Sequence, residues 1–134
     1  MKAIVVADTS PLNYLVLCGA VDVLPRLFDR VFIPTAVASE LQHPSTPAFV
    51  RNWIATLPAW SELRRPVSAN LGLNLGRGEQ EAIALGLELG AVAVLMDDRK
   101  ARLAAENTER RIPQNPPMFQ AGCLAGRESA ILDP

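Results

Sequence analysis

Four acidic residues stand where the chain could bring them to one site. Asp8 and Asp97 each follow a short, fully apolar run that predicts a buried β-strand. Glu40 lies about two turns into a helix that follows a second apolar strand, and Glu79 begins the helix that leads toward Asp97. In an open α/β sheet, ligands bind beyond the carboxyl ends of the strands. We therefore expect these four carboxylates to converge at one edge of the sheet.

A cluster of four carboxylates predicts cation binding. Two like charges ~4 Å apart repel by about 4 kcal/mol at an effective dielectric constant of 20. Such a cluster either takes up protons or binds a cation. Hard divalent ions prefer carboxylate oxygen, and Mg²⁺ or Mn²⁺ suits a site of carboxylates and water that leaves room for phosphate. The single His43 and the widely separated Cys18 and Cys123 argue against a zinc site.

Each acid, taken alone, also has a structural explanation. Ser10-Pro11 is a typical helix start, with Ser10 as the N-cap, and this leaves Asp8 without a capping role. Glu40 on its own could be a solvated helix residue. The functional interpretation of these two acids therefore depends on their convergence with the other two.

The later acids need the same comparison. Glu79 and Glu81 lie in the first turn of a helix, where carboxylates interact favourably with the helix dipole. Asp98 is expected to cap the next helix and to pair with Arg102 four residues on, which leaves Asp97 spare. The prediction of a site therefore depends on all four acids meeting near the strand ends, and not on any single residue.

The elements that must position these acids alternate along the chain. Strands are expected at residues 3–7, 31–33 and 91–96, with an edge strand at 60–65. Helices are expected from Ser10 to about residue 24 with a break near Gly19, then at 34–41, 47–57, 79–90 and 99–107. Uninterrupted apolar strands suit a parallel sheet covered on both faces. The predicted fold class is therefore α/β, a central mainly parallel sheet flanked by helices in three layers.

The length of 134 residues fits one domain. The last part of the chain departs from the alternation of strands and helices. Residues 1–107 carry the alternating elements. From Thr108, prolines and glycines leave no clean period, as at Pro113, Pro116 and Pro117. We predict an irregular or disordered tail over 108–134 and an atypical or incomplete C-terminal part of the fold.

The composition excludes several classes. A net charge of −1 argues against a nucleic-acid footprint over the whole chain, although it allows a local basic patch. Aromatic residues make up 5% of the chain, too few for a base-stacking platform. Two cysteines predict reduced thiols. With neither a signal peptide nor an apolar run of ~18 residues, we expect a cytoplasmic protein with no membrane partner.

Each of the four acids lies in a distinctive local segment. The segments are Val-Ala-Asp-Thr-Ser-Pro-Leu at 6–12, Ile-Pro-Thr-Ala-Val-Ala-Ser-Glu-Leu at 33–41, Gly-Arg-Gly-Glu-Gln-Glu-Ala-Ile at 76–83 and Leu-Met-Asp-Asp-Arg-Lys-Ala-Arg at 95–102. Together they resemble the PIN-domain superfamily of nucleases, and most of all its prokaryotic VapC-like toxin ribonucleases, over roughly residues 1–106. Members normally continue with another strand and a final helix, and the sequence from Ile112 predicts neither.

The resemblance implies a metal-dependent endoribonuclease that acts on RNA. The residues implied as catalytic and as ligands of one or two Mg²⁺ or Mn²⁺ ions are Asp8, Glu40, Glu79 and Asp97. Ser10 and Asp98 would belong to the outer shell. Phosphate groups of RNA also need cations, and the candidates near the acids are Arg77, Arg99, Lys100 and Arg102. A cognate antitoxin protein and a homodimer are implied as partners.

Two other interpretations stay open. A PIN-like module without catalytic activity, favoured by the unusual C-terminal part, would bind a partner protein and cleave nothing. A receiver-like phospho-acceptor domain also gathers strand-end acids around Mg²⁺. Such domains place paired acids after the first strand and a lysine after the last, whereas the Asp97-Asp98 pair comes late and no strand-end lysine is visible.

Overall fold

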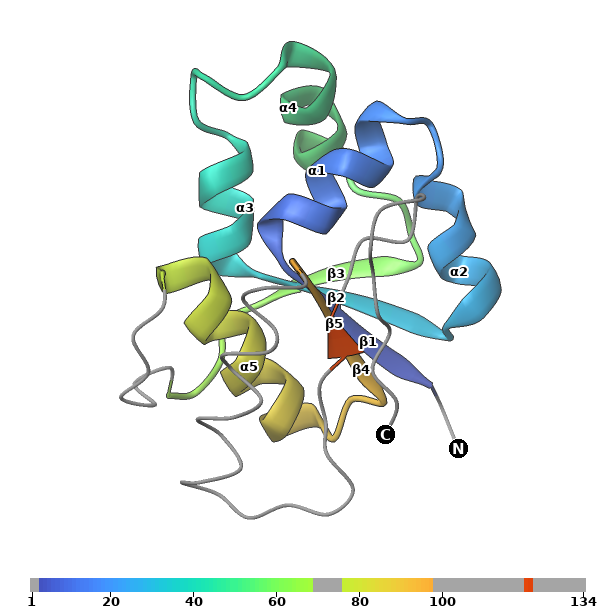
Figure 1. Cartoon of the computed structure of the whole chain (residues 1–134), viewed down its shortest axis with the longest axis vertical. Helices are drawn as coiled ribbons and strands as arrows, with labels where there is room; N and C mark the ends of the chain where they lie inside the picture. The colour runs from blue at the N-terminus through green and yellow to red at the C-terminus, as the bar shows by residue number, and fades with distance from the viewer. Residues whose placement is uncertain (1–2, 69–75, 98–119, 122–134) are drawn as a thin grey trace.

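The protein is built on a five-stranded parallel sheet (Figure 1). The structure is a computed structural model that describes residues 3–68, 76–97 and 120–121. The strands are β1 (Ile4–Ala7), β2 (Arg30–Pro34), β3 (Ser61–Arg64), β4 (Ala93–Met96) and β5 (Gln120–Ala121). They lie in the order β3-β2-β1-β4-β5, and every pairing is parallel. The predicted parallel α/β fold is confirmed.

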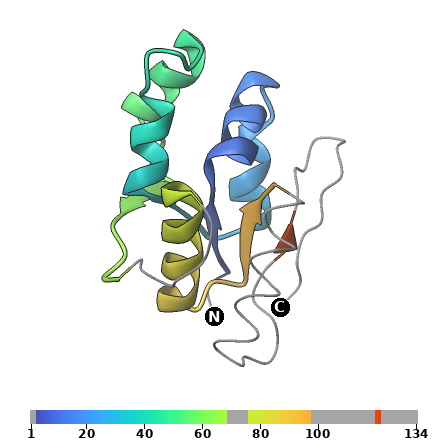
Figure 2. The ribbon, with the colours of Figure 1, turned by 60° about the vertical axis from the view of Figure 1, so that its left-hand side comes forward.

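Helices cover the two faces of the sheet (Figure 2). The helical elements are α1 (Thr9–Leu17), the 3₁₀ helix η1 (Val21–Val23), α2 (Leu24–Leu27), α3 (Thr35–Leu41), α4 (Ala48–Ala55) and α5 (Arg77–Leu89). Successive strand side chains point to opposite faces, so one sheet supplies two cores. Val5 and Ile33 pack with α1, α3 and α4, whereas Val6 and Met96 pack with α5.

The strand order places a switch point between β1 and β4. From β1 the chain builds β2 and β3 outward on one side, and then returns through α5 to place β4 on the other side of β1. Ala7 of β1 lies opposite Leu95 of β4, so these two strands end at nearly the same level. Ligands of open α/β sheets bind at such a point.

The start of α1 differs from the prediction. Ser10 was expected to cap this helix, but Asp8 occupies the N-cap position, and Leu12 N–H bonds to Asp8 O at 3.3 Å. The helix begins there because Asp8 has extended backbone and its N–H still continues the β1–β4 ladder, bonding to Leu95 O. Pro11 thus lies within the first turn, where its missing N–H costs no helical bond.

Other boundaries also shift. The helix predicted to run to residue 24 is broken near Gly19, as expected, but continues as the separate η1 and α2. Helix α4, predicted from residue 47, begins at Ala48 with Pro47 at its N-cap, and the hydroxyl of Thr46 donates to Glu40 O at 3.2 Å. Helix α5 ends as predicted at Gly90, which adopts the left-handed conformation with φ of 62°.

The C-terminal part contains one element that the sequence did not predict. Gln120–Ala121 forms β5, which pairs with Leu95 and Met96 of β4. The pairing is possible because β4 would otherwise present an open edge with unpaired backbone groups. The helix predicted at 99–107 and the rest of the 108–134 tail lie outside the described residues.

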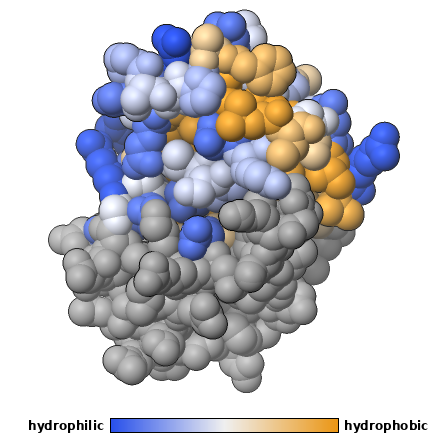
Figure 3. All heavy atoms as spheres, turned by 45° about the horizontal axis from the view of Figure 1, so that its top comes forward, coloured by the Kyte–Doolittle hydropathy of each residue, from blue (hydrophilic) through white to orange (hydrophobic). Residues whose placement is uncertain are grey.

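Exposed apolar side chains gather on the face that carries α1, α2 and α4 (Figure 3). Leu17 of α1, Leu27 of α2 and Phe49 of α4 are about half exposed or more. Within the part of the chain that the structure describes, no helix is long and apolar enough to cross a membrane.

Candidate functional site

Asp8 and Asp97 end two neighbouring strands, as predicted. Asp8 follows β1, and its backbone N–H donates to Leu95 O at 3.0 Å. Asp97 follows β4 directly. The two differ in environment, because Asp8 is only 1% exposed with both carboxylate oxygens buried, whereas Asp97 is exposed. An ionised carboxylate is costly to bury unless a positive charge or hydrogen-bond donors compensate it.

Glu40 comes to the same edge from α3. Its Oε1 accepts a hydrogen bond from Thr9 Oγ1 at 2.6 Å, across 31 positions of sequence. Thr9 is the first residue of α1 and the neighbour of Asp8. This bond therefore places the carboxylate of Glu40 beside the end of β1. Ser10, which the sequence predicts beside the acids, is exposed, and the hydroxyl of Thr9 contacts Glu40.

The carboxylate of Glu40 also lies against the first turn of α5. A Cβ placed on Gly78 would be 2.7 Å from Glu40 Oε2 and 3.1 Å from its Cδ. Only a glycine permits this approach, because real Cβ atoms do not come so close to a carboxylate. Glu79, the next residue, thus lies close to the segment that Glu40 contacts.

Glu79 has a structural environment of its own. It is 7% exposed, and a Cβ on Gly76 would meet its Oε1. Gly76 is the N-cap of α5 and Glu79 the third helical residue, the position from which a glutamate reaches back in a capping box. The side chain of Glu79 is therefore folded over the start of α5.

Three of the four predicted acids thus come from segments that contact one another, and the fourth ends the strand beside Asp8. The donors fit a hard divalent ion by chemical type, since all are carboxylate oxygens. Among the described residues, however, no three or more His, Cys, Asp or Glu side chains are grouped closely enough to hold a metal ion. In this arrangement Glu40 is bonded to Thr9.

Glu81 has a role that sequence reasoning missed. Its Oε1 accepts hydrogen bonds from Ala36 N at 2.9 Å and from Thr35 Oγ1 at 3.1 Å, at the start of α3. The sequence predicts that Glu81 acts on the dipole of its own helix, but its carboxylate contacts another one. No local pattern could reveal this role, because the partners are 45 and 46 residues away.

The predicted cations are only partly described. Arg77 is the first residue of α5 and its side chain is 83% exposed, with Nε 3.9 Å from Glu81 Oε2. It is the residue before Gly78, which the carboxylate of Glu40 approaches. The other predicted residues, which lie outside the described ranges, are Asp98, Arg99, Lys100 and Arg102.

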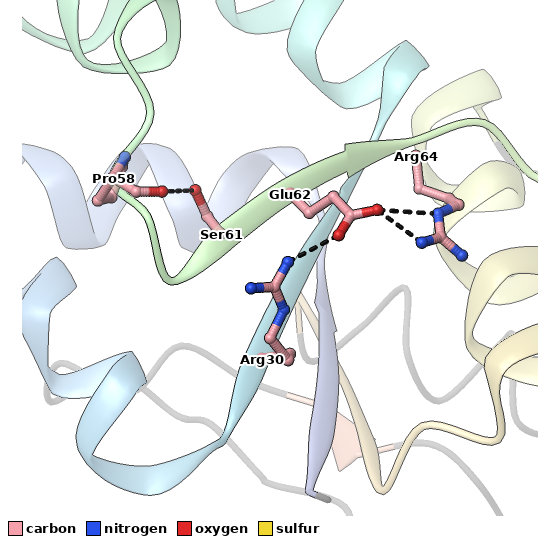
Figure 4. Close-up of polar contacts among 5 residues, drawn as sticks. All are labelled: Arg30, Pro58, Ser61, Glu62 and Arg64. Carbon is pink, nitrogen blue, oxygen red and sulfur yellow. Dashed lines mark hydrogen bonds and ion pairs between the residues drawn. The ribbon is translucent and has the colours of Figure 1, made fainter.

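A second charged group lies on β2 and β3 (Figure 4). Arg30 Nη2 and Arg64 Nη2 bond to the two carboxylate oxygens of Glu62 at 2.7 and 2.6 Å. Both guanidinium groups also lie near the Phe32 ring, at 5.8 and 4.9 Å from its centroid. The hydrogen bond from Arg64, with that from Arg30, holds the pKa of Glu62 below its usual value of 4.5, although partial burial opposes this. These contacts fasten β3 to β2 and involve none of the four acids.

Comparison with protein families finds a match over most of the chain. A family model described as a PIN domain (DUF3368) matches residues 4–112, a range that includes all four predicted acids. Comparison with curated proteins and with solved structures finds no match.

Proposed function

The chain belongs to the PIN-domain family, whose members are generally nucleases, and from this premise we propose that it is a Mg²⁺- or Mn²⁺-dependent endoribonuclease, the toxin of a toxin–antitoxin pair. The observation that carries the proposal is the position of Glu40. It is bonded to Thr9 beside Asp8 and lies over Gly78 beside Glu79. These contacts support the proposal, because they bring the segments that carry three of the acids together beside the end of β1, next to the switch point of the sheet.

The proposed site uses the carboxylates at that edge. The residues that would hold the metal are Asp8, Glu40, Glu79 and Asp97. When bound, such an ion acts as a Lewis acid that offsets negative charge on the phosphodiester. Asp8 provides a buried ligand fixed at the end of a central strand. Glu40 and Asp97 are exposed and can turn toward the ion and the substrate.

The substrate backbone needs positive charge beside the acids. Arg77 begins α5, next to Gly78, and its long exposed side chain can contact an RNA phosphate. Among the cations predicted from the sequence, it is the one within the described residues. Asp98 and Ser10 remain proposed outer-shell residues, and Arg99, Lys100 and Arg102 remain proposed phosphate contacts.

Metal-dependent cleavage tests the proposal. A pool of structured and single-stranded RNA is incubated with Mn²⁺ or Mg²⁺ and either the wild type, Asp8→Asn or Asp97→Asn. We expect cleavage that requires the metal and falls by at least about 100-fold in both variants, because substitutions even of outer-shell groups cost 10–100-fold. Asp22→Asn is the matched control, since Asp22 is an exposed acid of η1, which precedes β2.

A folded wild type that cleaves no RNA, with a thermal stability that metal does not change, would contradict the proposal. The catalytically inactive interaction module would then be the better interpretation. Cleavage that persists in Asp8→Asn would instead place the catalytic site elsewhere.

The same proposal includes a homodimer and a cognate antitoxin protein. What supports a protein partner is the exposed apolar face of α1, α2 and α4, defined by Leu17, Leu27 and Phe49. Contiguous apolar patches on a protein surface commonly mark interaction sites.

A further inference from the structure

The start of α3 depends on a residue from another helix. Helix α3 follows β2 directly, and Pro34, which has no polar side-chain atom, occupies its N-cap. The first N–H groups of a helix have no partner within it. Glu81 of α5 provides one, since its Oε1 accepts from Ala36 N at 2.9 Å and from Thr35 Oγ1 at 3.1 Å. Glu81 is buried, with 8% of its side chain exposed.

The other end of α3 rests on the same helix. Glu40 is four residues after Ala36, about one turn or 6 Å along the axis. Its carboxylate lies over Gly78, three residues before Glu81 in α5. Helix α3 is thus held on α5 at two points, its first turn by Glu81 and its last by the contact between Glu40 and Gly78.

We infer that Glu81 is a positioning residue, which anchors α3 on α5 so that Glu40 reaches the proposed metal site, and that Glu81 is not itself a ligand. The inference rests on the proposed function. Charge-assisted hydrogen bonds from a backbone amide are strong, and here one carboxylate oxygen is fully engaged by α3. The other oxygen lies 3.9 Å from Arg77. Two buried acids two positions apart in α5 therefore have different roles.

The first measurement tests the hydrogen bond between Glu81 and the Ala36 amide. Glu81→Gln keeps an oxygen that can accept both hydrogen bonds, whereas Glu81→Ala leaves the Ala36 amide without an acceptor. We expect amide hydrogen exchange at Ala36 to accelerate by about 10-fold or more in Glu81→Ala and to stay near the wild-type rate in Glu81→Gln. Equal exchange rates in the wild type and Glu81→Ala would overturn the anchoring.

The second measurement separates an anchor from a ligand. Mn²⁺ affinity is measured by titration without RNA, for Glu81→Gln and for the matched substitution Glu79→Gln. We expect Glu81→Gln to stay within about 3-fold of the wild type, and Glu79→Gln to bind at least about 10-fold more weakly. An equal loss in both variants would make Glu81 a ligand and overturn the inference.

These results also distinguish failure of the inference from failure of the proposed function. A wild type that binds no Mn²⁺ and cleaves no RNA refutes the function, and with it a role for Glu81 in the reaction. The exchange rates at Ala36 still decide whether Glu81 anchors α3. Full cleavage by Glu81→Ala, with fast exchange at Ala36, would show that the anchor does not position Glu40.

Discussion

At the scale of single residues, Glu40 is where three segments of the chain meet. Its Oε1 bonds to Thr9, which follows β1 and Asp8, and its Oε2 lies over Gly78 at the start of α5. Neither contact arises from local sequence, since each joins residues more than 30 positions apart. Small changes at Thr9 or Gly78 should therefore act on the site through the position of one carboxylate.

Gly78→Ala tests this at the closest contact. The new Cβ would lie 2.7 Å from Glu40 Oε2, so the exposed carboxylate must turn away from α5. We expect RNA cleavage to fall by about 10-fold or more. Stability should change by less than about 1 kcal/mol, because alanine is the better helix former and Glu40 can rotate. Cleavage assays and thermal unfolding measure the two effects, and unchanged cleavage would show that the position of Glu40 does not matter.

At the scale of elements, side-chain hydrogen bonds and ion pairs connect the short elements β3 and α3 to their neighbours. Strand β3 is at the edge of the sheet and is four residues long, with Leu63 exposed. The ion pair of Glu62 with Arg30 connects β3 to β2, and Arg64, which also bonds to Glu62, lies over the Phe32 ring of β2 (Figure 4). Helix α3 has a comparable contact, since the carboxylate of Glu81 accepts a hydrogen bond from the Ala36 amide in its first turn. In both cases a carboxylate bonds to a group of another element, Glu62 of β3 to Arg30 of β2 and Glu81 of α5 to the start of α3.

We expect the substitution Glu62→Gln to lower the free energy of unfolding by an amount that depends on pH. The arginines lower the pKa of Glu62 in the folded protein, so its ionic contribution is present above the unfolded pKa, near 4.5, and is lost as pH falls through the folded pKa. At neutral pH we expect a loss below about 1 kcal/mol, because Glu62 is about one-third exposed and solvent screens the pair.

Chemical unfolding of the wild type and Glu62→Gln at neutral pH and below pH 4 measures this difference. The difference in free energy of unfolding between the wild type and Glu62→Gln should become smaller at the acidic pH, and also in high salt. A gap that is constant with pH would mean that the carboxylate contributes by packing and not by charge. Asp22→Asn, an exposed acid on η1, is the control.

At the scale of the whole molecule, the acids and the exposed apolar side chains occupy different parts of the surface. Asp8 and Asp97 follow the carboxyl ends of β1 and β4, whereas Leu17 lies at the end of α1, one helix length away from Asp8. With Leu27 and Phe49 it gives one helical face an apolar character (Figure 3). This separation would leave the exposed carboxylates of Glu40 and Asp97 uncovered when a second copy or an antitoxin binds the apolar face.

Phe49→Lys tests the proposed homodimer. Phe49 is 64% exposed on α4, and a charge there should oppose burial of the apolar face between two copies. We expect light scattering to give a dimer for the wild type and a monomer for the variant. Val67→Lys is the matched control, because Val67 is 90% exposed after β3 and should leave the dimer intact. A wild-type monomer at all concentrations would refute the homodimer.

Local sequence patterns alone predict β1 to β4, their mainly parallel arrangement, and Asp8 and Asp97 after β1 and β4. Apolar runs such as those before Asp8 and Asp97 specify buried strands through local pattern alone, and the match to the PIN-domain family at 4–112 confirms the kinship that four short segments indicated. Two features emerge only in the folded protein: Asp8, and not Ser10, is the N-cap of α1, and Glu81 accepts hydrogen bonds from the start of α3. These features depend on backbone and carboxylate bonds between distant segments. Periodicity and helix propensity depend on a residue and its near neighbours. The packing of α3 on α5, in contrast, brings Glu81 to Ala36 and Glu40 to Gly78.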